Sequence, residues 1–255
     1  YKHNGLLKAS IMSATNAHRL GANEAPPAII SSFLGKQLSE LLDHIEKADK
    51  ENILAMDGKQ GLKMNIPEIP ELLIDNTDRN RTSPFAFVGN RFEFRALGSS
   101  MSAADPLVVL NAMMAESLDF AATFLENALK SGAANLGEAV QKLIEHVMEE
   151  DGAVIFNGNG YSPIWQKEAL RRGLPNYPAT PDAVQVYLED PVIKLCENYR
   201  IFSRQELKAR HDIQLEQYIK TVHTECSLAI RMARTQIFPA AMRYRSELAS
   251  SISAC

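Results

Sequence analysis

Apolar residues recur every three or four positions along most of this chain, which is the spacing of one face of an α-helix. The pattern predicts helices over residues 27–50, 99–130, 136–148 and 162–172, and again from residues 180 and 204 onward. Ser203 and Glu206 have the spacing of a capping box at the start of the last helix. Pro239 has no amide hydrogen to donate, so we expect it to kink or end this helix.

The long helix that starts at residue 204 carries a second apolar pattern. Its apolar and small residues alternate steps of four and three, as in the seam of a coiled coil. This seam consists of Leu215, Ile219, Val222, Cys226, Ala229 and Ala233. It predicts either packing against the rest of the chain or a contact between subunits, and the sequence favours neither.

Residues 83–95 change from helical spacing to strict alternation, which is typical of half-buried strands. Gly89 and Asn90 separate two alternating runs and predict a two-residue hairpin turn. In that register one face holds Phe85, Phe87, Phe92 and Phe94. The other face holds Arg91, Glu93 and Arg95, with neighbours about 6–7 Å apart. A surface strand with solvated ion pairs would show the same pattern, because exposed pairs are common and weak.

The glycine-rich residues 152–161 lack the lysine of a phosphate-binding P-loop, so we interpret them as a structural turn that includes Asn157 and Asn159. Trp165, the only tryptophan of the chain, is expected to anchor local packing.

These elements predict an α-rich α+β fold with a small antiparallel sheet. The 255 residues allow one large domain or two smaller ones, and the composition changes near residue 130. We therefore expect a mixed domain at residues 1–130 and a helical extension at residues 131–255. The chain starts at Tyr1 rather than at methionine, and we expect it to be the C-terminal part of a longer protein.

Composition excludes several classes of function. A net charge of −4 gives no basic surface for nucleic acid, and no apolar run approaches the ~20 residues of a membrane span. We therefore expect no nucleic-acid or membrane partner. The three cysteines are scattered and do not have metal-site spacing, which fits a reducing cytoplasm.

The alternating hairpin suggests chemistry with anionic oxygens. A carboxylate between two guanidinium groups can hold a divalent ion while the arginines bind phosphate or carboxylate. Arg19 and Glu24 stand in a second segment, a loop that is bounded by Pro26 and Pro27. A loop of this kind can exclude water from a reactive intermediate.

Three segments resemble the type III glutamine synthetases. They are residues 18–27 (HRLGANEAPP), 80–95 (NRTSPFAFVGNRFEFR) and 155–161 (IFNGNGY). The resemblance extends over essentially the whole chain, including its helical C-terminal part. It implies joining of ammonium to glutamate at the expense of ATP, through γ-glutamyl phosphate, with Mg²⁺ or Mn²⁺ as cofactor. It also implies assembly of identical subunits into rings, that is, a homo-oligomer.

The resemblance implies a role for each charged residue of the hairpin. Arg91 matches an arginine that contacts the phosphates of ATP. Glu93 matches a carboxylate ligand of the catalytic metal ion. Arg95 matches an arginine that binds the carboxylate of the glutamate substrate.

It implies three further roles outside that strand. Arg19 matches the arginine that begins the glutamate-binding flap. Glu24 matches the flap glutamate that shields the intermediate and helps to deprotonate ammonium. Arg81 matches the arginine that steadies the transferring phosphoryl group.

The chain departs from the common family pattern in three respects. The flap has one residue fewer between Arg19 and Glu24, and Ala86 stands where another arginine is usual. The chain also holds only one ligand of the family's metal set, so we expect that it cannot make glutamine by itself. Two alternatives remain: a non-catalytic helical module for assembly or regulation, and a ligase that joins another amine to glutamate.

Overall fold

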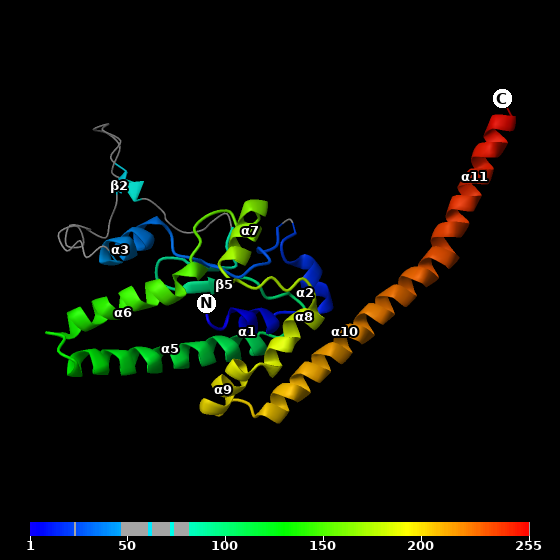
Figure 1. The fold of residues 1–255 in the computed structure, drawn as a ribbon. Coiled ribbons are helices and arrows are strands. Elements are labelled where there is room, and N and C mark those ends of the chain that lie inside the picture. The colour runs from blue at the N-terminus through cyan, green and yellow to red at the C-terminus, as the bar shows by residue number, and fades with distance from the viewer. Residues whose placement is uncertain (23, 47–60, 63–71, 74–81, 255) are drawn as a thin grey trace.

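A computed structural model of the chain describes residues 1–22, 24–46, 61–62, 72–73 and 82–254 (Figure 1). The helices are α1 (Asn4–Ala9), α2 (Ala14–Arg19), α3 (Lys36–Glu46), α5 (Ala104–Lys130), α6 (Leu136–Asp151), α7 (Pro163–Arg171), α8 (Thr180–Val184), α9 (Asp190–Asn198), α10 (Arg204–Met232) and α11 (Phe238–Ser253). Two 3₁₀ turns, η1 (Gly152–Val154) and η2 (Gln185–Leu188), and one π-helical turn, η3 (Ala233–Ile237), join some of them. The strands are β1 (Ser32–Phe33), β2 (Gly61–Leu62), β3 (Leu72–Leu73), β4 (Phe85–Phe87) and β5 (Phe92–Phe94).

The predicted hairpin forms with the predicted register. Strands β4 and β5 are antiparallel, with Phe85 opposite Phe94, Ala86 opposite Glu93 and Phe87 opposite Phe92. The amide of Val88 donates to the carbonyl of Arg91 at 2.9 Å, which leaves Gly89 and Asn90 as the two-residue turn. Gly89 has a φ of +96°, a conformation that glycine adopts without strain. The α-rich α+β class with a small sheet is therefore confirmed.

The sheet has one strand that the sequence did not predict. Strand β1 pairs in parallel with β4, so the three-stranded sheet has the order β1-β4-β5 and is mixed rather than purely antiparallel. Residues 27–50 were predicted as one helix, but α3 begins only at Lys36. Gly35 has a φ of +79°, and Ile29 and Ile30 are buried in the core instead of lying on a helix face. Tertiary packing overrides the local helical spacing at these residues.

The core lies between α1, the start of α5 and the segment from α8 to α10. Its buried side chains are almost all aliphatic, and Leu6, Leu7, Val109, Leu195 and Leu207 are among them. Helices α5 and α6 form an antiparallel hairpin that extends from this core (Figure 1). By length and apolar composition alone α5 could cross a membrane, as could many buried core helices; in α5 only 11% of the most apolar 18 residues are buried.

Helix α10 begins with the predicted capping box. The Ser203 hydroxyl accepts from the Glu206 amide at 3.3 Å, and the Glu206 carboxylate accepts from the Ser203 amide at 2.8 Å. Pro239 does not end the helix; it follows the π-helical turn η3, and the helix continues as α11 with a bend (Figure 1). A wider turn relieves the clash between a proline ring and the carbonyl four residues earlier, which explains the position of the bend.

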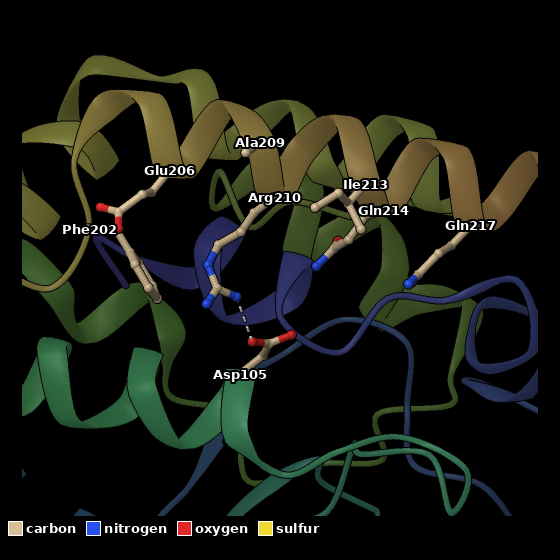
Figure 2. A pocket seen from close by; sticks show the side chains of 8 residues that line it. All are labelled: Asp105, Phe202, Glu206, Ala209, Arg210, Ile213, Gln214 and Gln217. Atoms are coloured by element: carbon tan, nitrogen blue, oxygen red, sulfur yellow. Dashed lines mark hydrogen bonds and ion pairs between the residues drawn. The ribbon is translucent and has the colours of Figure 1, made fainter.

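The first part of α10 packs against α8 and η2, and an ion pair links it to the start of α5. Arg210 points from α10 towards Asp105, and their side chains form an ion pair of 3.0 Å (Figure 2). The same guanidinium lies over the ring of Phe202 at 4.0 Å from the ring centroid. Leu215 still packs against the core, but Ile219 is 63% exposed and Cys226 is exposed, so the described residues cover the predicted seam only in part.

Candidate active site on strand β5

The charged residues of β5 form one linked group. Both the Nε and the Nη2 atom of Arg95 donate to one carboxylate oxygen of Glu93, at 3.3 and 3.1 Å. Arg91 approaches the other oxygen at 3.5 Å. Exposure rises along the strand: the side chain of Arg95 is 14% exposed, that of Glu93 40% and that of Arg91 66%. The group therefore has a fixed inner end and an accessible outer end.

Phenylalanine rings support the group from the other face of the hairpin. The rings of Phe85 and Phe94 meet edge to face, with centroids 5.6 Å apart, and the ring centroid of Phe92 lies 5.2 and 5.3 Å from those of Phe85 and Phe87. All four rings gather on one face, as the alternation predicted. Aromatic contacts of this kind stabilise the hairpin and hold the charged side chains in place.

Asn16 connects Arg19 to the end of β5. The Asn16 amide nitrogen donates to the carbonyls of Ile11 and Ala96, at 2.7 and 3.0 Å. Its amide oxygen accepts from Arg19 at 3.0 Å, and the same arginine atom lies 3.4 Å from the carbonyl of Leu97. Asn16 is 1% exposed. One buried side chain therefore fixes the distance between the two predicted substrate-binding arginines, Arg19 and Arg95.

The loop after Arg19 is closed by its own backbone. The Gly21 amide donates to the Pro26 carbonyl at 2.8 Å, and the Ala25 amide donates to the Ala22 carbonyl at 3.2 Å. Glu24 is exposed at the outer part of this loop and has a φ of +62°. A non-glycine residue in this region costs about 1–2 kcal/mol, and such strain is common where a side chain must point in a required direction.

Two side chains from other segments hold the base of the loop by hydrogen bonds. The Tyr161 hydroxyl donates to the Ala25 carbonyl at 2.5 Å. The Lys8 ammonium, on helix α1, donates to the Ala28 carbonyl at 2.5 Å. Lys8 is 2% exposed, and burial lowers the pKa of its ammonium group to about 8.

The glycine-rich segment does more than turn the chain. Asn159 behaves as predicted, since its side chain accepts from the Tyr161 amide at 2.9 Å. Asn157 accepts from the amides of Leu34 and Gly35 at 3.0 and 3.1 Å, which joins this segment to the chain after β1. At Gly160 an added Cβ would lie 2.5 Å from the Thr82 carbonyl, so only glycine fits there.

Trp165 is the predicted packing anchor. It is 2% exposed, and its ring stacks on Phe156 with centroids 3.7 Å apart. Arg172 covers the same indole ring at 5.3 Å. This cluster fixes the glycine-rich segment that carries Tyr161.

The predicted site residues are placed as follows. The structure brings Arg91, Glu93 and Arg95 together on β5 and ties Arg19 to the end of that strand. Arg81 lies outside the described residues. Ala86, which stands at the place of a usual arginine, is completely buried opposite Glu93, so it offers no group to a phosphate.

Sequence reasoning missed Asn16, Lys8 and Tyr161 as parts of this site. Each is a side chain that holds a backbone carbonyl of a distant segment. Tyr161 lies inside the motif of residues 155–161, and Asn16 lies just before the motif of residues 18–27. This proximity was the signal in the sequence that could have indicated their role.

Within the described residues, no group of three or more His, Cys, Asp and Glu side chains is arranged to hold a metal ion. Glu93 has the hard carboxylate oxygens that Mg²⁺ and Mn²⁺ prefer, and it is accessible from solvent. It fits the role of one metal ligand, and a complete ligand set would need oxygen donors from beyond the described residues.

A separate groove of about 440 Å³ lies between α10 and the start of α5 (Figure 2). The Asp105–Arg210 pair stands in it, and none of the predicted site residues lines it. Its lining belongs to the contact between α10 and the start of α5, so the candidate site remains β5 and the loop after Arg19.

Comparison with known proteins identifies relatives of this chain. Residues 139–255 match the family model described as glutamine synthetase C-terminal domain. The chain is 42% identical to a glutamine synthetase of Bacteroides fragilis over 252 residues, which is 99% of this chain and 34% of that relative. It is 36% identical to a glutamine synthetase of Butyrivibrio fibrisolvens over 97% of this chain and 34% of that relative.

Residues 139–255 thus match the C-terminal domain of glutamine synthetases, and nearly the whole chain is similar to members of the glutamine synthetase family. Within it, the chain is similar to a type-3 glutamine synthetase of Dictyostelium discoideum, with 40% identity over 98% of this chain and 33% of that relative. The resemblance to type III enzymes is confirmed. The chain spans about a third of the length of these curated relatives.

Proposed function

We propose that this chain forms part of a glutamate–ammonia ligase that consumes ATP and passes through γ-glutamyl phosphate. The observation that carries this proposal is the linked group on β5, in which Glu93 is held between Arg91 and Arg95 above a cluster of phenylalanine rings. Phosphoryl transfer requires positioning and neutralisation of negative charge more than covalent catalysis, and this group supplies both.

The exposure gradient along β5 supports separate roles for the two arginines. Arg91 is exposed and its guanidinium can turn towards the phosphates of ATP. Arg95 donates two hydrogen bonds to Glu93 and lies directly after β5, which suits a fixed contact with the glutamate carboxylate. Glu93 would exchange part of its contact with the arginines for a bound Mg²⁺ or Mn²⁺, which neutralises phosphate charge during transfer.

The loop after Arg19 supports the roles proposed for the remaining residues. Arg19, fixed through Asn16, would bind the substrate at the start of the flap. Glu24, exposed on that loop, would accept a proton from ammonium and help to exclude water. Arg81 would steady the transferring phosphoryl group, which remains a prediction from the sequence.

The proposed domain division near residue 130, the cytoplasmic location and the assembly into a homo-oligomer also remain proposals. Assembly is supported by the long helix α10–α11, whose side chains are exposed over most of its length in the part of the chain that the structure describes.

The Glu93→Ala and Glu93→Gln variants of the complete gene product test the ligase proposal. We expect both to lose almost all glutamine formation while their oligomeric state, measured by light scattering, is unchanged. The control is Glu126→Ala, which removes an exposed carboxylate on α5 that pairs only with Lys130 in the described structure. If Glu93→Ala disrupts assembly and the remaining intact particles keep full specific activity, β5 is structural and the proposal is wrong.

A second measurement uses the 255-residue chain alone. Because one metal ligand cannot make a site, we expect no glutamine from ATP, glutamate and ammonium. Turnover by the purified chain would show that its own residues complete the site.

A further inference from the structure

The C-terminal half of the long helix has no covering within the described structure. We define residues 223–254 as the arm. Every residue of the arm is exposed except Pro239 and Met242, which are half-buried. The arm projects away from the rest of the molecule as one extended helix (Figure 1). An isolated helix is only marginally stable in water, so a long exposed helix is expected to be stabilised by a partner.

The arm presents an apolar stripe. Steps of four, three, four and four residues place Ile237, Ala241, Tyr244, Leu248 and Ile252 on one face. Ile237 and Tyr244 are each 62% exposed, and Ile252 is 76% exposed. Such a stripe is the usual signature of a helix face that packs against another element.

The charge of the arm restricts what this partner can be. Residues 226–246 contain four arginines and no acidic residue. They are Arg231, Arg234, Arg243 and Arg245, and no described residue forms an ion pair with them. Two arms side by side over this segment would bring arginines together, so the partner surface should be acidic as well as apolar.

The α5–α6 hairpin has these two properties. Residues 104–151 contain nine acidic residues and two lysines, which is a net charge of −7. On α6, Leu136, Val140 and Val147 form a stripe whose members are 58%, 36% and 37% exposed. Glu149 and Glu150 follow this stripe at the helix end; both are exposed, and neither has an ion-pair partner among the described residues.

The arm does not reach this hairpin within one chain, because α11 and α6 lie at opposite ends of the molecule (Figure 1). We propose that the arm of one copy docks on the α5–α6 hairpin of a second copy, with its apolar stripe against that of α6 and its arginines against the acidic end of α6. This inference deepens the assembly part of the proposed function and does not depend on ligase activity.

The test measures self-association of the 255-residue chain by sedimentation velocity over a range of concentrations. We expect concentration-dependent association, and its loss when the chain ends at residue 222. Arg243→Glu with Arg245→Glu should weaken association by about tenfold or more, and so should Glu149→Lys with Glu150→Lys. In a mixture of these two variants both contacts between unlike copies are matched in charge, so the mixture should associate more strongly than either variant alone. The fourfold variant should associate within about threefold of the original chain.

The control carries the same charge change elsewhere. Lys167→Glu with Lys194→Glu alters two exposed lysines on α7 and α9 and should leave association unchanged. Circular dichroism checks that every variant keeps its helices. Three outcomes overturn the proposal: a monomer at all concentrations, a fourfold variant as weak as either double variant, or an arm that binds vesicles with anionic lipid while the chain does not self-associate.

Discussion

Replacing Asn16 with alanine tests whether one buried amide holds the segments of the candidate site together. The Asn16 side chain is 1% exposed and takes part in three hydrogen bonds that an alanine cannot make. Two of them satisfy the carbonyls of Ile11 and Ala96, which lie in different parts of the chain. The third holds the guanidinium of Arg19.

The expected cost follows from these three bonds. Each contributes about 1 kcal/mol net, and a buried carbonyl left without a donor costs at least as much. Alanine favours helix α2 over asparagine by up to about 0.7 kcal/mol, which offsets part of the loss. We therefore expect Asn16→Ala to lower the free energy of unfolding by about 2–3 kcal/mol.

Urea unfolding followed by circular dichroism measures this loss. The matched control is Asn111→Ala on α5, where the asparagine is exposed and its amide donates only to the Leu107 carbonyl of its own helix. That change should alter stability by less than about 0.5 kcal/mol. A loss as small as this for Asn16→Ala would refute the reasoning, because the three bonds could then be replaced by water or by rearrangement.

Two further predictions concern Lys8 and Ser203. The pKa of Lys8 is lowered by burial from 10.5 to about 8, so between these pH values the unfolded chain binds a proton that the folded chain does not. The free energy of unfolding should therefore rise with pH through this window, by up to about 3 kcal/mol, and urea titrations at pH 7.5 and 9.5 should show that Lys8→Met lacks this rise. Parallel pH profiles for the two proteins would contradict this. Ser203→Ala removes half of the capping box and should lower the free energy of unfolding by about 1 kcal/mol. The control Ser227→Ala, inside the exposed part of α10, should not lower it. Equal effects of the two changes on the free energy of unfolding would show that the cap contributes nothing.

The hairpin could be predicted in detail because its information is local. Alternation fixes which side chains share a face, and Gly89 with Asn90 fixes the turn, so the register of Phe85 with Phe94 follows. The capping box at Ser203 is local in the same sense. The family motifs then supplied the proposed roles of Arg91, Glu93 and Arg95, which spacing alone could not.

Strand β1 could not be predicted, because it forms by pairing with residues that are distant in the sequence. Its residues have helical spacing, but Ser32 and Phe33 pair with a strand more than fifty residues later. Helix α3 could begin only after Gly35, because the positive φ of this glycine interrupts the helical backbone conformation. Parallel pairing leaves no local sequence signal, since the two strands are joined by a long connection.

The residues that support the site were missed for a related reason. Asn16, Lys8 and Tyr161 each satisfy a backbone carbonyl that has no partner in its own segment. A sequence shows which side chains can donate a hydrogen bond, but a carbonyl that lacks a donor becomes evident only when the segments are packed together. The arginines and the glutamate of the site can be recognised by their chemistry, whereas the groups that set their positions can be recognised only by their contacts. Variants of these contacts should therefore affect stability first and catalysis second, and variants of Glu93 should do the reverse.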